Sequence, residues 1–582
     1  MTEKKNTFKK EKNDFILYLP GFWNLIDSGL KQLKNEKIID RIWQHEHTVW
    51  KSDPTEISNR LGWLHTPRIM KDSVPEIQLF VEEVKKEGFT QALLLGMGGS
   101  SLASTVLRSV FGVKTGYLDL HVLDSTNPGA VLHVDRMIDP EKTLFIVSTK
   151  SGSTAETLSF MRYFYNRTMQ KVGEQKVGSH FIAITDPGSK LESPAEQLGF
   201  RKVFLNDPNI GGRYSSLSYF GLVPAGLIGT DLKQLLNTAQ DMAGTADTGY
   251  SLTEQNNTPA VLGTVMGMLA RQGRDKLTFI TSPEIQSFGT WVEQLVAEST
   301  GKEGKGILPV VNETVLQPDK YEDDRIFVYL KLDKDVTFHK EVKSLRQTGH
   351  PLIQIHLNDR YELGSEFFRW ELATAVSGYF LKINPFDQPN VEATKKLTKK
   401  MVITFQDKGK LPETEPSLKT DILSVFTDKT VHSIEQALEH FFTYLNPGKE
   451  GKCRSYVAIQ AFVQPELETD KALQQFRTKI QKTYKVATTV GYGPRFLHST
   501  GQLHKGDGGQ GLFIQITGEI SKDIPVPDKA GKEKSSISFG VLALAQALGD
   551  REALLDAGRT VIRFHLKTEN TEGISLLTKA IR

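Results

Sequence analysis

A loop rich in hydroxyl groups, residues 149–157 (TKSGSTAET), directly follows an apolar run at residues 143–148. An apolar run of this length that ends in turn residues is typical of a buried parallel strand. The loop predicts the start of a helix near Thr154, with Glu156 in its first turn. Backbone N–H groups at a helix start, together with hydroxyls and one ammonium group, suit a phosphate-sized anion. The side chains expected to contact this anion are Thr149, Lys150, Ser151, Ser153 and Thr154. The alternative is a turn that only caps the helix.

A second loop, residues 96–101 (GMGGSS), follows the strand-like residues 91–95 and leads into another predicted helix. Its expected ligand-binding residues are Gly99 and Ser100. The glycine spacing differs from GxGxxG, so the loop gives only weak support to a dinucleotide site. Two hydroxyl-lined anion loops favour a phosphate ester instead, and we expect no cofactor.

Alternating strand-like and helix-like segments predict the elements that position both loops. Further strand-like segments lie at residues 120–124, 181–185 and 202–205. This alternation predicts an open, doubly wound α/β sheet. Ligands of such sheets bind at the carboxyl ends of the strands, and both loops fall at that edge.

Several short motifs follow one another along the chain. They are residues 96–101, 149–154, 211–215 (GGRYS), 298–302 (ESTGK) and 386–388 (FDQ). Their order resembles that of glucose-6-phosphate isomerases, which are built from sugar-isomerase (SIS) domains. The resemblance covers roughly residues 60–400. With residues 59–64 and 494–504, the whole chain is most similar to the isomerase half of bifunctional transaldolase/glucose-6-phosphate isomerases, whose transaldolase half has no counterpart here.

A chain of 582 residues is too long for one hydrophobic core. We expect an α/β fold with two doubly wound parallel-sheet SIS domains and a smaller C-terminal α+β domain. The expected parts are an N-terminal tail and helices at residues 1–55, SIS domains at residues 56–250 and 251–406, and the C-terminal domain at residues 420–582.

The resemblance implies reversible isomerisation of glucose 6-phosphate and fructose 6-phosphate through an enediolate, a step of glycolysis and gluconeogenesis. Such an enzyme must hold the phosphate, open the sugar ring, move a proton between adjacent carbons and stabilise an oxyanion. These tasks do not strictly require a metal, and the 14 histidines show no convincing metal-ligand spacing. The family also implies a homodimer.

Glu298 is the expected proton shuttle. It falls near the end of a predicted helix, after apolar residues and before a glycine-rich turn. Gln294 lies one helical turn earlier on the same face and is expected to bond sugar hydroxyls. A glutamate at a helix end is by itself most often a surface charge. The ESTGK context resembles the isomerase base motif and implies the catalytic role.

Two basic residues complete the set that the resemblance implies. Arg213 matches the arginine that faces the enediolate, whereas the residues alone also allow a structural ion pair. Lys395 falls where the family has its ring-opening lysine, counted from residues 386–388. The sequence departs from the family pattern after Gln388, and the adjacent Lys396 leaves this alignment open.

One departure from the family concerns ring opening. Isomerases of the common type have a ring-opening histidine at the start of the helix that corresponds to residues 366–381, and here that position is Glu366. Either Glu366 does this work, or another histidine enters the site, or the substrate arrives already open. The candidate histidines are His498 and His504, in the glycine-flanked residues 497–506. Loops of that composition often carry function, so this segment is slightly favoured, although an isolated histidine is more often structural.

Composition limits the remaining functions. The 72 Lys and Arg nearly balance 69 Asp and Glu, which offers no basic field for nucleic acid or an anionic membrane. The N-terminus lacks an apolar signal core and no run approaches the ~18 apolar residues of a membrane span, so we expect a cytoplasmic protein. The alternative functions are another phosphosugar isomerase, such as a phosphoglucose/phosphomannose isomerase, and a non-catalytic sugar-phosphate-binding SIS protein.

Overall fold

A computed structural model describes residues 9–10, 13–247, 257–412, 414–448 and 454–582. Contacts within the chain divide it into two compact units. The first unit contains Met1–Lys86, Leu102–Tyr117 and Asn206–Asp387. The second unit contains Glu87–Ser101, Leu118–Leu205 and Gln388–Arg582.

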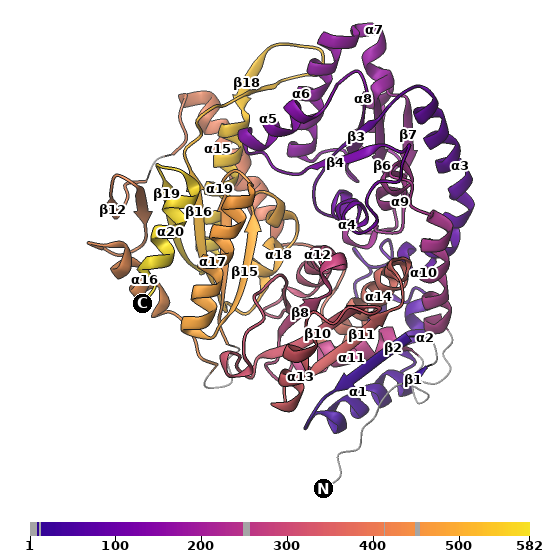
Figure 1. The fold of residues 1–582 in the computed structure, drawn as a ribbon, viewed down its shortest axis with the longest axis vertical. Helices are drawn as coiled ribbons and strands as arrows, with labels where there is room; N and C mark the ends of the chain where they lie inside the picture. Colours follow the sequence, from indigo (N-terminus) through magenta and orange to yellow (C-terminus); the bar gives the residue numbers. More distant parts are fainter. Residues whose placement is uncertain (1–8, 11–12, 248–256, 413, 449–453) are drawn as a thin grey trace. The chain divides into compact units, whose positions relative to one another are not determined.

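A five-stranded parallel sheet in the second unit carries both predicted anion loops (Figure 1). Its order is β4-β3-β5-β6-β7, with β3 at Gln91–Gly96, β4 at Asp119–Leu123, β5 at Thr143–Ser148, β6 at Phe181–Thr185 and β7 at Lys202–Leu205. Helices α5 (Pro128–Met137), α6 (Ala155–Val172), α7 (Glu174–Val177) and α8 (Glu192–Gln197) belong to the same unit. Every residue of β5 is buried, as in a parallel strand that is covered on both faces. Phe160 and Phe164 of α6 pack against the sheet in one apolar cluster.

The C-terminal part of the second unit forms a six-stranded sheet in the order β12-β13-β19-β16-β14-β15. Its strands are β12 (Leu418–Lys419), β13 (Leu423–Phe426), β14 (Tyr456–Phe462), β15 (Ala487–Tyr492), β16 (Gly511–Gly518) and β19 (Thr560–Leu566). Its helices are α15 (Val391–Lys408), α16 (Ile434–Phe442), α17 (Leu467–Tyr484), α18 (Gly501–Gly506), α19 (Phe539–Asp556) and α20 (Asn570–Ala580). The β19-β16-β14-β15 strands are all parallel, so this sheet has more α/β character than the expected α+β domain.

Residues 525–538, which carry no strand signal in the sequence, form a hairpin of β17 (Pro525–Pro527) and β18 (Ser535–Ser538). Ile524, Val526 and Phe539 join the apolar cluster of α6. The aromatic rings of Phe160 and Phe539 are stacked at 5.9 Å. The hairpin and the start of α19 therefore attach the C-terminal part to the helix that follows the anion loop.

The first unit is built on a mixed six-stranded sheet, in the order β1-β2-β11-β10-β8-β9. The strands β11-β10-β8-β9 are parallel, whereas β1 and β2 pair antiparallel. Its strands are β1 (Lys9–Lys10), β2 (Asn13–Tyr18), β8 (Lys276–Thr281), β9 (Leu308–Val310), β10 (Arg325–Leu332) and β11 (Leu352–Leu357). Its helices are α1 (Trp23–Asn35), α2 (Ile38–Trp43), α3 (Thr66–Lys86), α4 (Leu102–Phe111), α9 (Tyr219–Leu227), α10 (Leu232–Asp247), α11 (Thr258–Ala270), α12 (Phe288–Thr300), α13 (His339–Gln347) and α14 (Leu363–Leu381).

Two helices of the first unit are buried around almost their whole circumference. All but one residue of α14 is buried, and α11 is buried from Pro259 to Ala270. A helix without a polar face belongs in a core. The two helices pack closely because Gly263 has no side chain: a Cβ there would lie 2.5 Å from the Ala373 carbonyl oxygen.

Two expectations about the chain's organisation are corrected. Residues 15–18 were expected to belong to the N-terminal helices at residues 15–55, but residues 13–18 form β2, which pairs antiparallel with β11. A short apolar run does not distinguish strand from helix, and the open edge of β11 decides in favour of the strand. The expected domain boundaries also differ from the units, because α10 packs with α14 of the first unit and α15 packs on α19 of the second.

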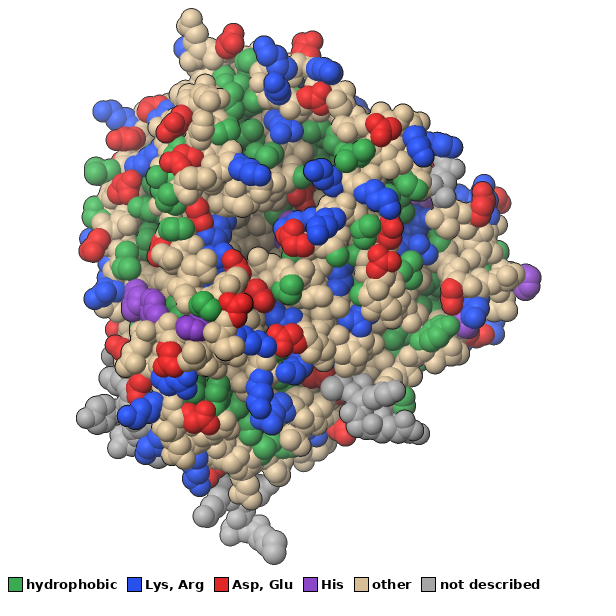
Figure 2. Space-filling model, turned by 180° about the vertical axis from the view of Figure 1, so that it is seen from behind, with side chains coloured by type: hydrophobic (Ala, Val, Ile, Leu, Met, Phe, Trp, Pro, Cys, Tyr) green, Lys and Arg blue, Asp and Glu red, His purple; other side chains and the backbone are tan. Residues whose placement is uncertain are grey.

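The surface carries charges of both signs. Figure 2 shows Lys and Arg side chains interspersed with Asp and Glu on the visible face, with apolar side chains between them. Within the described part of the chain, no helix combines the length and the apolarity needed to cross a membrane.

Candidate active site

The loop at residues 149–154 connects β5 to α6 and presents the start of this helix. Thr154 is the N-cap of α6, but its side chain makes no capping hydrogen bond and instead lies 3.0 Å from the Thr149 hydroxyl. The Thr154 side chain therefore leaves the first-turn N–H groups to other acceptors, as an anion site requires. The Ser151 and Ser153 hydroxyls are exposed and lie 2.8 Å from each other.

Gly152 gives this loop its shape. Its φ of +66° belongs to the left-handed region, and a Cβ there would lie 2.2 Å from the Leu191 backbone nitrogen. Only glycine satisfies both conditions. Lys150, the expected ammonium group of the loop, forms an ion pair with Asp186.

The second loop lies beside the first because β3 and β5 are neighbours in the sheet. The Ser148 hydroxyl donates to the Ser100 carbonyl oxygen at 2.7 Å, which joins the end of β5 to the Gly98–Ser100 turn. Gly99 and Ser100 are both partly exposed. The structure thus brings the expected phosphate-binding residues together at one edge of one sheet.

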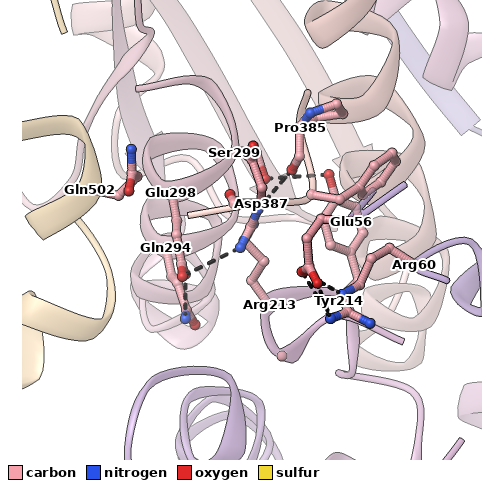
Figure 3. A network of polar contacts seen from close by, with 12 residues as sticks. Glu56, Arg60, Arg213, Tyr214, Gln294, Glu298, Ser299, Pro385, Asp387 and Gln502 are labelled. Carbon is pink, nitrogen blue, oxygen red and sulfur yellow. Dashed lines mark hydrogen bonds and ion pairs between the residues drawn. The ribbon is translucent and has the colours of Figure 1, made fainter. Parts of the chain in front are cut away.

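In the first unit, α12 positions Glu298 and Gln294. Residues four apart lie on the same helical face, and Gln294 Nε2 donates to Glu298 Oε2 at 2.9 Å (Figure 3). Gln294 is buried, whereas the side chain of Glu298 keeps 13% of its surface exposed. The carboxylate is thus fixed by a neighbour and still open to a ligand.

Arg213 lies on the other side of this carboxylate and is 3% exposed. Its Nη1 is 3.4 Å from Glu298 Oε1, and Nε donates to the Ser299 hydroxyl at 2.7 Å. Nη2 donates to the carbonyl oxygens of Pro385 and Asp387 at 2.8 and 2.9 Å (Figure 3). These contacts hold a permanent positive charge beside Glu298.

Lys302 adds a second buried cation after the end of α12. Its ammonium group donates to Asp387 Oδ1 at 2.6 Å and to the Asp387 carbonyl oxygen. Burial and the nearby Arg213 charge lower the pKa of Lys302 to about 8, against the opposing effect of Asp387. The FDQ and ESTGK motifs therefore meet through this pair.

Two expected acid–base residues lie in cores. Glu366 is 1% exposed and accepts from Arg369 at 2.9 Å, and burial raises the pKa of its carboxyl despite that arginine. His504 is 2% exposed, lies among aromatic rings including Phe513 at 5.0 Å, and burial lowers its pKa well below the usual range.

Lys395 lies on an exposed face of α15, where it pairs with Glu392 at 2.7 Å. It also acts on Glu156 in the first turn of α6. Burial alone would raise the pKa of the Glu156 carboxyl, but His498, and to a smaller degree Lys395, hold that pKa below its usual value. His498 and Lys395 thus both lie near the Glu156 carboxylate in the second unit.

Within the described residues, no group of three or more His, Cys, Asp or Glu side chains has the arrangement to hold a metal ion.

Comparisons with known proteins show which proteins the chain resembles. The family model of phosphoglucose isomerase matches residues 79–308. A glucose-6-phosphate isomerase of Carboxydothermus hydrogenoformans is 29% identical over 58% of this chain and 84% of its own length. One of Rubrobacter xylanophilus is 28% identical over 64% of this chain and 94% of its own length. A crystal structure of a glucose-6-phosphate isomerase from Chlamydia trachomatis shares the fold, with a TM-score of 0.59 at 18% identity over 69% of this chain and 90% of that one.

These comparisons support the glucose-6-phosphate isomerase family for this chain. The expected family and the expected SIS-type parallel sheets are confirmed. The closer resemblance to the bifunctional enzymes stays a prediction.

Sequence reasoning missed several residues of the candidate site. Ser299 and Lys302 stand in the ESTGK motif, and Asp387 in the FDQ motif, so their place beside Arg213 could have been inferred from the motifs. Gln546 lies in α19 and donates to Glu156 at 2.6 Å. No sequence pattern connects residues so distant in the chain.

Proposed function

We propose that this chain is a glucose-6-phosphate isomerase that interconverts glucose 6-phosphate and fructose 6-phosphate through an enediolate. The observation that carries the proposal is the Glu298 carboxylate, partly exposed at the end of buried α12 and held by Gln294 and Arg213. Family membership gives the substrate class.

Glu298 is the proposed general base. It removes the proton from C2 of open-chain glucose 6-phosphate and returns it to C1, and the reverse path starts from C1 of fructose 6-phosphate. Arg213 places its charge beside this carboxylate, where negative charge on the enediolate oxygens develops. Because its other N–H groups are bonded to Ser299, Pro385 and Asp387, Arg213 needs little reorganisation during the reaction.

The loops at residues 149–154 and 96–101 are proposed to hold the phosphate. The Ser151 and Ser153 hydroxyls, with the first N–H groups of α6, supply donors for its oxygens. The phosphate ester does not change during isomerisation, so these contacts stabilise the ground state and the transition state equally.

Gln294 is proposed to bond sugar hydroxyls, and Lys395 to assist ring opening. We propose no substrate contact for Glu366 or His504, because both are buried in cores. We also infer a homodimer, as the family implies, and a cytoplasmic location. Light scattering of the purified chain tests the dimer, which requires twice the mass of one chain.

A coupled assay with glucose 6-phosphate, fructose 6-phosphate and mannose 6-phosphate tests the function. We expect conversion between the first two that is lost in Glu298→Gln. Equal rates with mannose 6-phosphate would instead favour the phosphoglucose/phosphomannose alternative. Binding of the sugar phosphates without turnover would favour a non-catalytic protein.

A further inference from the structure

At the position where the family's common type has its ring-opening histidine, this chain has Glu366. The second unit contains another candidate for ring opening, His498. We propose that His498, brought to the anion loop by the C-terminal part of the same chain and oriented by Glu156, is the acid–base residue that opens the sugar ring. This inference rests on the proposed function and adds a catalytic role for the C-terminal part.

Glu156 is the residue that orients the His498 side chain. It occupies the first turn of α6, two residues after the N-cap Thr154, and is 5% exposed. A carboxylate is favoured at a helix N-terminus, but at this degree of burial it needs hydrogen-bond donors. Two donors come from the C-terminal part: His498 Nε2 lies 2.9 Å and Gln546 Nε2 2.6 Å from Glu156 Oε1.

The partners of Glu156 are themselves held in place. The Thr126 hydroxyl donates to Gln546 Oε1 at 2.7 Å, which fixes the amide that faces Glu156. Three residues before His498, Arg495 donates to both oxygens of Asp124 at 2.6 and 2.7 Å. A bidentate pair is the geometrically specific form of this contact. The 3₁₀ turn Arg495–His498 is therefore held at one end by Asp124, directly after β4, and at the other by Glu156 of α6.

The imidazole has the position that ring opening requires. In glucose 6-phosphate, the ring oxygen O5 is only a few bonds from the phosphorus atom. A group that protonates O5 must therefore come from beside the phosphate loop. Glu156 belongs to the first turn after that loop, and the side chain of His498 keeps 24% of its surface exposed. His504, by comparison, is 2% exposed among aromatic rings.

Proton transfer follows from the Glu156 contact. The carboxylate accepts the proton of Nε2, so proton exchange with a ligand falls to Nδ1. The protonated imidazole donates from Nδ1 to O5 while the C1–O5 bond breaks and leaves its electron pair on O5. The anomeric hydroxyl releases its proton to water, and the O–H electron pair forms the C1=O carbonyl. The imidazole then regains a proton from water, and ring closure reverses these steps.

Anomer exchange of fructose 6-phosphate, measured by NMR, isolates this step. The parent variant is Glu298→Gln, in which isomerisation is removed and ring opening is retained. Adding His498→Gln should slow the catalysed exchange by about 10²-fold, the usual contribution of one acid–base group. Adding His432→Gln, at an exposed histidine of the C-terminal part, should leave the exchange unchanged. Exchange within twofold of the parent in the His498 variant would overturn the inference.

Two measurements separate catalysis from structure. In His498→Ala, added imidazole should restore part of the lost exchange, and the affinity for fructose 6-phosphate should change little. No rescue, together with a parallel loss of affinity, would assign His498 a structural role and overturn the inference. Glu156 is a positioning residue in this scheme. Glu156→Gln should therefore lower kcat without raising KM, and Glu156→Asp should recover part of the lost kcat.

The two proposals fail in different ways. If the wild-type chain does not isomerise either sugar phosphate, the proposed function fails, whatever the anomer exchange shows. If the wild type isomerises and the His498 variants behave like it, only the inference about His498 fails.

Discussion

The replacement of Glu298 by glutamine is the sharpest test of the candidate site. Glutamine has the shape of glutamate, and its amide can still bond Gln294 with the two side-chain amides reoriented. What it lacks is a basic oxygen that takes a proton. The change therefore removes the proposed proton transfer and leaves the surroundings of the substrate in place.

The expected magnitude follows from the contacts of the site. A positioned general base contributes about 10²–10⁴-fold to the rate, which corresponds to roughly 3–5 kcal/mol of barrier. The variant also loses the 3.4 Å ion pair with Arg213, but Arg213 keeps its bonds to Ser299, Pro385 and Asp387. We expect the free energy of unfolding to change by only about 1 kcal/mol.

A coupled spectrophotometric assay gives kcat and KM, and calorimetry gives the affinity for fructose 6-phosphate. The matched control is Glu303→Gln, which removes the same charge a few residues later from a side chain that is 46% exposed. We expect a fall of at least about 10²-fold in kcat, an affinity within a few fold of wild type, and an unaffected control. More than about a tenth of wild-type turnover in Glu298→Gln would refute the assignment of Glu298 as proton shuttle, because no general base of ordinary strength contributes so little.

Three further predictions concern the loop and the buried cation. Ser151→Ala with Ser153→Ala should raise KM for phosphorylated sugars with little change in kcat, because the phosphate is held alike in ground and transition states. Gly152→Ala should lower the free energy of unfolding by at least about 2 kcal/mol, because the strain at positive φ and the clash of the new Cβ with backbone atoms both destabilise the folded chain. The pKa of Lys302 is about 8 in the folded chain against its usual value of 10.5, so the unfolded chain binds more protons between these pH values. The free energy of unfolding of wild type should therefore rise with pH over this window relative to Lys302→Met.

Each of these predictions has a contrary outcome. A fall in kcat at constant KM in the double serine variant would show that the loop does more than grip the ester. A Gly152→Ala variant that melts at the wild-type temperature would contradict the strain and the clash. Parallel pH profiles of wild type and Lys302→Met would mean that Lys302 keeps an ordinary pKa in the folded chain.

The local patterns of the sequence predicted the elements that carry the candidate site. The apolar run before residues 149–154 predicted β5, and the hydroxyl-rich loop predicted the start of α6. The spacing of Gln294 and Glu298 predicted that they share one face of α12, as their hydrogen bond confirms. These predictions succeed because helix periodicity and strand burial are properties of adjacent residues.

Predictions that needed distant partners were less complete. β2 was missed because its apolar residues pair with β11, more than three hundred residues away, and its local partner β1 is only two residues long. The β17–β18 hairpin has little apolar patterning of its own, and its place depends on the cluster around α6.

The division between sequence and tertiary structure is clearest at the acid–base residues. Motif order in the sequence indicated the family and selected the loop at residues 149–154 and Glu298 as candidates for anion binding and for the general base. It did not decide among Glu366, His498 and His504, since all three are residues of suitable chemistry in plausible segments. Burial separates them: Glu366 and His504 lie in cores, and His498 remains partly exposed beside Glu156. Exposure and pairing depend on which segments pack together, so only the tertiary structure decides which titratable group faces a ligand.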